Sequence, residues 1–151
     1  MTNLADLGRF YATVKAKKGR IDIVFANAAV AEGAPLAAIT EDHFDRHFDI
    51  NVKGLVFAVQ KALPLLADGS SIVLTSSVSG VKGTPGLSNH SATKAAIRKL
   101  ARSWVLDLKA RKIRVNAISP GATVTTTCSV ACAGLRFDRK RAPTATGSWR
   151  T

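Results

Sequence analysis

The spacing of apolar residues predicts alternating helices and strands along most of the chain. Residues 3–18 carry apolar side chains three or four positions apart, which indicates an amphipathic helix that Gly19 can end. Residues 21–26 form a short, β-branched apolar run, which is typical of a buried strand. Thr40 is a good N-cap for a second helix over 41–66, whose first turn is acidic.

The same alternation continues down the chain. A turn at 68–70 leads into a second buried strand at 71–75, a third helix covers about 90–111, and a third strand covers 113–118. Strands that alternate with helices build a parallel sheet with right-handed crossovers, so we expect an α/β fold. Asn51 falls on the apolar stripe of the second helix, which is an unusual place for an amide.

The pattern stops after residue 126. Residues 127–151 are rich in Thr, Ala, Gly and Arg without apolar periodicity, and we expect an irregular basic tail there. The predicted organisation is therefore one partial α/β domain over 1–126 and a tail over 127–151.

The charge is strongly basic, with a net of +12 and a pI of about 10.4. The tail contributes +4 of this and residues 1–126 contribute +8. Most basic residues of the body are spaced along helices, which is typical of a solvated face, and the chain is only 6% aromatic. We therefore expect no nucleic-acid partner, and a basic nucleic-acid-binding module is kept as the third interpretation.

Composition also bears on location. No apolar run approaches the roughly 18 residues of a membrane span, and the N-terminus lacks the basic start and apolar block of a secretory signal. Two cysteines do not make a disulfide framework, and Cys128 and Cys132 lack the spacing of a zinc or redox motif. We expect a cytoplasmic protein without a membrane partner.

Two histidines, His43 and His47, lie four apart on the second helix, a spacing that can bind a metal. No third ligand is evident from the sequence, so we expect an exposed helix face and no metal.

Polar or turn residues follow each predicted strand. They are Asn27, Ala28 and Ala29 after the first, Ser76 and Ser77 after the second, and Pro120, Gly121, Thr123 and Thr125 after the third. Because ligands of parallel α/β sheets bind at the carboxyl ends of the strands, these residues predict one shared crevice. Lys94, early in the third helix, lies at the same edge. The alternative is that short polar residues merely end strands.

Several motifs together resemble the short-chain dehydrogenase/reductase family over roughly residues 1–126. They are Asn27-Ala28-Ala29, Asn51-Val52-Lys53-Gly54, Ser77, Ser91-Ala92-Thr93-Lys94 and Pro120-Gly121, in unbroken order. The resemblance implies a partial Rossmann-like, doubly wound parallel sheet with about three strands and three helices. It also implies NAD or NADP as cofactor and a small alcohol or carbonyl as substrate.

The resemblance also implies roles for individual residues. Ser77 would hold the substrate oxygen, Lys94 would bind the nicotinamide ribose, and Asn51 would order a water in the proton relay. The segment Asn27, Ala28 and Ala29 would lie by the adenosine side. Pro120, Gly121, Thr123 and Thr125 would lie by the nicotinamide carboxamide.

Three departures from the family pattern lower the expected activity. His90 occupies the position of the family's proton-transferring tyrosine, thirteen residues after Ser77 and four before Lys94. A neutral imidazole reaches less far from the backbone than a tyrosine hydroxyl, and it is a poorer acid for a developing alkoxide. The chain also lacks the family's glycine-rich phosphate-binding turn, and residues 127–151 resemble neither the substrate-binding lobe nor the last strand that the family has in that region.

We therefore predict an oxidoreductase-like fragment whose hydride transfer is weak or lost. The alternative is a non-catalytic fragment that associates with a full-length relative. The helices at 41–66 and 90–111 resemble the family's dimer-forming pair and predict a homodimer. The strand at 21–26 would be an apolar edge that favours either association or aggregation.

Overall fold

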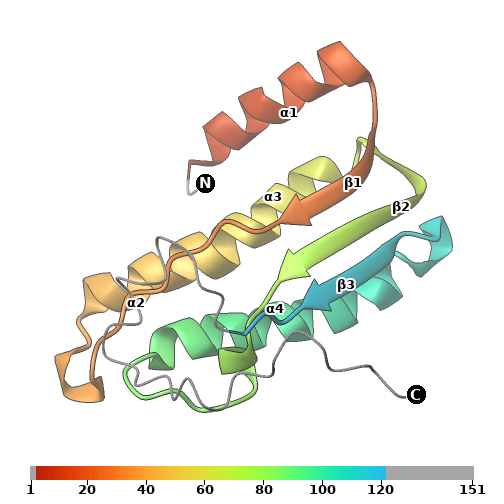
Figure 1. Cartoon of the computed structure of the whole chain (residues 1–151). Coiled ribbons are helices and arrows are strands. Elements are labelled where there is room, and N and C mark those ends of the chain that lie inside the picture. The colour runs from red at the N-terminus through yellow and green to blue at the C-terminus, as the bar shows by residue number, and fades with distance from the viewer. Residues whose placement is uncertain (1–2, 122–151) are drawn as a thin grey trace, which may run out of the picture.

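The computed structural model describes residues 3–121, which fold into a three-stranded sheet with helices packed against it (Figure 1). Thr123, Thr125, both cysteines and the tail lie outside the described residues. The elements are α1 (Leu4–Lys18), β1 (Ile21–Ala26), α2 (Glu41–Phe48), α3 (Leu55–Ala62), β2 (Leu66–Thr75), α4 (Ser88–Asp107) and β3 (Arg114–Ile118), with 3-10 turns at Leu36–Ala38, Val78–Gly80 and Lys109–Arg111.

The sheet is parallel and its order is β1-β2-β3, which confirms the predicted α/β fold. Each crossover between neighbouring strands contains a helix, as parallel connections require. All three strands therefore point the same way, and their carboxyl ends meet at one edge of the sheet (Figure 1).

The core lies between the sheet and the two helices α3 and α4. Ile72 and Leu74 on β2 are fully buried, and they belong to one apolar cluster with Val59 of α3 and Ile97 of α4. Burying a side chain of this size stabilises the fold by about 1.5–3 kcal/mol. The central strand is thus the main anchor of the sheet.

The first strand is less buried than predicted. Ile23 and Phe25 lie on the face of the sheet opposite to that of Val24 and Ala26, and they are 68% and 58% exposed. Only Ala26 of this strand is buried. The prediction of a buried strand was wrong, because a continuous apolar run does not reveal that one face of a strand is left uncovered.

Two other predicted boundaries were also wrong. The helix expected over 41–66 ends at Ala62, two residues before Pro64, which has no N–H for a further helical bond. The turn expected at 68–70 lies within β2, whose register with β1 shifts between Ile21 and Ile23. Gly69 adopts φ +82° there, so the segment is an irregularity in a longer strand.

Helix termini otherwise follow the sequence signals. The Thr40 hydroxyl accepts from His43 N at 3.2 Å and caps α2, and Gly19 ends α1 with φ +75°. Between α2 and α3 the backbone widens into a π-helical segment, Asp49–Gly54, which contains Asn51. Such segments occur frequently at functional sites.

Candidate active site

The carboxyl ends of the three strands are joined by hydrogen bonds. The Thr75 hydroxyl at the end of β2 donates to Asn27 Oδ1 at 2.9 Å, and Ser76 N donates to Ile118 O at 2.8 Å. Val78 N donates to Pro120 O at 3.0 Å. The segments predicted to share a crevice therefore lie side by side.

Lys94 is fixed against the end of β2. Its Nζ donates to Thr75 O at 2.7 Å, and its own carbonyl accepts from the Ser76 hydroxyl at 2.7 Å. The residue is only 4% exposed, and this burial lowers the pKa of the Lys94 ammonium group. An ammonium group has three N–H donors, so Lys94 retains donors beyond the one that binds Thr75.

Ser77 begins the 3-10 turn that follows β2. Its Oγ accepts from Ser79 N at 3.2 Å and from the Ser79 hydroxyl at 2.9 Å. A hydroxyl has two acceptor sites and one hydrogen, so both acceptor sites are engaged. The Ser77 hydrogen is the part of the group that can bind a carbonyl or alcohol oxygen.

His90 points its Nδ1 at the carbonyl of Val30, 3.1 Å away. A carbonyl only accepts, so Nδ1 carries the hydrogen, and in the neutral ring Nε2 is then an acceptor. Burial is the main cause that lowers the pKa of His90; the hydrogen bond to Val30 O opposes it, and electrostatic interactions with Lys94 and His47 lower the pKa further. The structure shows no hydrogen bond that joins His90 to Ser77 or Lys94 within residues 3–121.

Asn51 uses its whole amide to hold the segment after β1. Its Oδ1 accepts from Val30 N at 2.8 Å, and its Nδ2 donates to Val30 O at 2.9 Å and to the Thr93 hydroxyl at 3.1 Å. Both Asn51 and Thr93 are fully buried. An amide on the apolar stripe is therefore explained by its hydrogen bonds, which satisfy the Val30 backbone and connect the π segment to Thr93 of α4.

The sequence reasoning missed Gly80. A Cβ built on it would lie 2.8 Å from Lys94 C and 2.9 Å from Ala95 N, which is closer than real Cβ contacts. The turn that carries Ser77 can thus approach the α4 backbone only with glycine at this position. The signal was a glycine three residues after Ser77, which looked like an ordinary loop glycine.

The histidine pair on α2 also differs from expectation. His47 is fully buried and His43 is half-buried, so the prediction of an exposed helix face was wrong. Both rings pack against the loop that contains Glu32. Among the described residues, no group of three or more His, Cys, Asp or Glu side chains could hold a metal ion, and no helix is long and apolar enough to cross a membrane.

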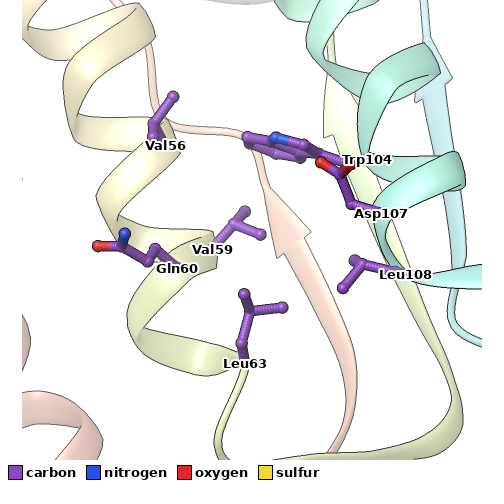
Figure 2. A pocket seen from close by; sticks show the side chains of 7 residues that line it. All are labelled: Val56, Val59, Gln60, Leu63, Trp104, Asp107 and Leu108. Carbon is purple, nitrogen blue, oxygen red and sulfur yellow. The ribbon is translucent and has the colours of Figure 1, made fainter. Parts of the chain in front are cut away.

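A separate apolar groove lies between α3 and α4. Figure 2 shows the side chains that face it from both helices, with the Trp104 ring at one end. Its volume is about 190 Å³. Trp104 is ten residues beyond Lys94 on α4, or about 15 Å along the axis, so the groove is distinct from the strand-end site. The lining residues are Val56, Val59, Gln60, Leu63, Trp104, Asp107 and Leu108.

Comparison with protein families adds an independent finding. A family model described as enoyl-(acyl carrier protein) reductase matches residues 1–145. Among curated proteins, the chain is 50% identical over 127 residues to oxidoreductase asL5 of Sarocladium schorii, covering 83% of this chain and 51% of that protein. It is 37% identical over 107 residues to the 3-oxoacyl-[acyl-carrier-protein] reductase FabG of Thermotoga maritima, covering 70% and 44%. The chain spans about half the length of these relatives.

Solved structures show the same likeness. A short-chain dehydrogenase/reductase from Brucella melitensis superposes with a TM-score of 0.83 at 28% identity, covering 88% of this chain and 54% of that one. An NAD+-bound xylitol dehydrogenase gives 0.79 at 31%, covering 85% and 51%. A blue fluorescent protein from a metagenomic library, in complex with NADPH, gives 0.78 at 28%, covering 83% and 51%.

Proposed function

The chain belongs to the short-chain dehydrogenase/reductase family, and on that premise we propose that it carries a weakened hydride-transfer site. The reaction would move a hydride between a nicotinamide cofactor and a small alcohol or carbonyl compound. The observation that carries this proposal is the position of Lys94, whose amine is bonded to the end of β2 beside the Ser77 turn.

The residues at the strand ends fit the nicotinamide half of NAD or NADP. Lys94 retains N–H donors for ribose hydroxyls, and Pro120 and Gly121 follow β3 at the same edge. Solved relatives contain NADPH or NAD+. We propose that Asn27, Ala28 and Ala29 line the adenosine side, with Thr123 and Thr125 by the carboxamide. When bound, the cofactor would give or take the hydride.

Ser77 and His90 would act on the substrate oxygen in different ways, because His90 occupies the position of the family's proton-transferring tyrosine. With both acceptor sites engaged, Ser77 can donate its hydrogen to that oxygen. Neutral His90 already gives its only N–H to Val30, so it has no proton to pass to an alkoxide unless the ring is charged. The lowered pKa of His90 makes that charged form scarce near neutral pH. We infer that this limits carbonyl reduction.

The proposal predicts that His90→Tyr raises reductase activity. A phenol reaches farther and carries its own proton near neutral pH, so the gain should be about 10²-fold or more, within the range of general acid catalysis. The measurement is NADH and NADPH oxidation with a panel of aldehydes, ketones and 3-oxoacyl esters.

His90→Phe is the matched control, because it has the same ring as Tyr without the hydroxyl. It should show no gain. If the Tyr and Phe variants are equally inactive with cofactor bound, the missing proton donor is not what limits the chain.

The α3–α4 groove favours a second candidate function, a non-catalytic role through association. Its apolar lining fits either a homodimer through the helices at 41–66 and 90–111 or a mixed oligomer with a full-length relative. Native mass spectrometry of the chain mixed with an intact reductase discriminates the two roles. Mixed oligomers without cofactor binding favour association, and a saturable cofactor site favours the enzyme.

A further inference from the structure

All three histidines of the chain lie around one short segment, residues 30–32, which follows the predicted adenosine-side motif. His90 bonds Val30 O from α4, while His43 and His47 bond the backbone of Glu32 from α2. Neither the family match nor the proposed hydride transfer assigns a role to the two α2 histidines.

The partners of His47 fix its protonation. Its Nε2 lies 3.1 Å from Glu32 N, which is a donor, so Nε2 must accept. Its Nδ1 lies 2.8 Å from His43 O, which is an acceptor, so Nδ1 carries the hydrogen. The ring is fully buried and neutral, and both of its nitrogens are used.

His43 takes the opposite tautomer. Its Nε2 donates to Glu32 O at 3.2 Å, and its Nδ1 accepts from Asn89 Nδ2 at 3.1 Å. The two imidazole rings lie against each other, with centroids 4.4 Å apart. Together they satisfy both backbone groups of Glu32, which the loop itself would leave unpaired.

The charged groups around the pair do not favour an added proton. The Glu32 carboxylate pairs with Arg46 Nη2 at 3.0 Å, and Asp49 of the π segment pairs with Lys53 at 3.1 Å. From α4, the titratable group that interacts with His47 is His90, which in turn interacts with the buried Lys94. A proton on His47 Nε2 would face the N–H of Glu32 with no acceptor, on a ring that is fully buried.

We propose that His43 and His47 form an acid-sensitive clamp, which holds the Glu32 backbone while His47 is neutral and releases it when His47 is protonated. His47 is the sensor, and His43 is the partner that holds the carbonyl. Release would loosen the loop from which Val30 bonds Asn51 and His90, and so would disturb the edge of the strand-end site. That last coupling rests on the proposed function, but the clamp does not.

The first test reads the tautomers of the unmodified chain. Long-range ¹H–¹⁵N spectra at about pH 7.5 should show His47 with its hydrogen on Nδ1 and His43 with its hydrogen on Nε2, as their hydrogen-bond partners require. A charged His47, or a His47 hydrogen on Nε2, overturns the proposal.

The second test follows amide hydrogen exchange at Glu32, expressed as a protection factor so that intrinsic pH effects cancel. Between about pH 7.5 and about pH 5.5, protection should fall roughly tenfold, the effect of losing one net hydrogen bond. The Leu74 amide in the central strand reports global unfolding and should fall less.

His47→Gln keeps an acceptor for Glu32 N but cannot gain a proton, so its protection at Glu32 should stay constant. His43→Gln and His90→Asn are matched controls that leave His47 titratable, and both should retain the acid loss. An equal loss in His47→Gln and the parent chain, or a loss no larger than at Leu74, overturns the proposal. No cofactor is needed, so failure here is distinguishable from failure of the oxidoreductase assignment.

Discussion

At the scale of single residues, the existing hydrogen bonds decide which hydrogens each side chain of the site can still donate. Ser77 has both acceptor sites engaged and can give its hydrogen, while Lys94 has donors to spare. His90 gives its only neutral hydrogen to Val30. Ser77 and Lys94 thus retain hydrogens for the substrate oxygen and the ribose that we propose they bind, and His90 is turned toward a backbone carbonyl.

His90 also predicts a pH dependence of stability. Its pKa is lowered in the folded chain relative to about 6.5 in an unfolded one, so the unfolded state binds more protons once the pH falls below that value. The contribution of His90 to the free energy of unfolding should therefore be complete above about pH 6.5 and should decrease as the pH falls below that value.

The measurement is urea unfolding of the parent and of His90→Asn at about pH 7.5 and about pH 5.5. Asn can still donate to Val30 O from nearly the same place but does not titrate, so the variant should lose less stability in acid. An identical acid loss in the two chains contradicts a lowered His90 pKa.

At this scale, spacing along the chain could place Ser77 after β2 and Lys94 early in α4, because strand ends and helix turns have fixed periods. His90 was identified by the family resemblance alone, and the roles of all three residues stay predictions. Sequence reasoning failed for His47 because the same helical spacing suits an exposed face and a buried one. What buries His47 is a loop fifteen residues earlier, whose path no local pattern shows.

At the scale of elements, the site depends on how closely the Ser77 turn approaches α4. Gly80 allows that contact, since its missing Cβ would lie 2.8 Å from the Lys94 backbone. The Ser76 hydroxyl bonds the Lys94 carbonyl in the same region. The turn and the helix therefore form one unit that sets where Ser77 lies relative to Lys94.

Gly80→Ala should separate these two elements. Overpacking against backbone costs about 1–3 kcal/mol, and Gly83→Ala, which meets nothing within 4 Å, is the matched control. Urea unfolding measures both. Equal stability of the two variants would contradict the close approach.

The sequence predicted the elements well where their apolar pattern was long. The third helix and the parallel order are examples, since α4 covers most of the predicted 90–111. The end of α3 and the start of β2 were misplaced, because a glycine-containing irregularity inside a strand has the same composition as a turn.

At the scale of the molecule, the described part of the chain is a sheet whose helices pack beside it and whose β1 side chains Ile23 and Phe25 are largely exposed. Strand β1 is an edge strand of the described sheet, as predicted for 21–26, and its exposed side chains lie on the uncovered face. The α3–α4 groove (Figure 2) and the strand-end site lie at different ends of α4, so binding of cofactor and association can be tested separately.

The central claim is that a nicotinamide site remains at the strand ends, and fluorescence titration with NADH and NADPH tests it most directly. The parent chain should give a saturable change with at least one of them. Lys94→Met, checked for folding by circular dichroism, should bind about tenfold more weakly or worse, because it loses charged hydrogen-bond donors. No saturable change in the parent, or equal binding by a folded Lys94→Met chain, would contradict the claim.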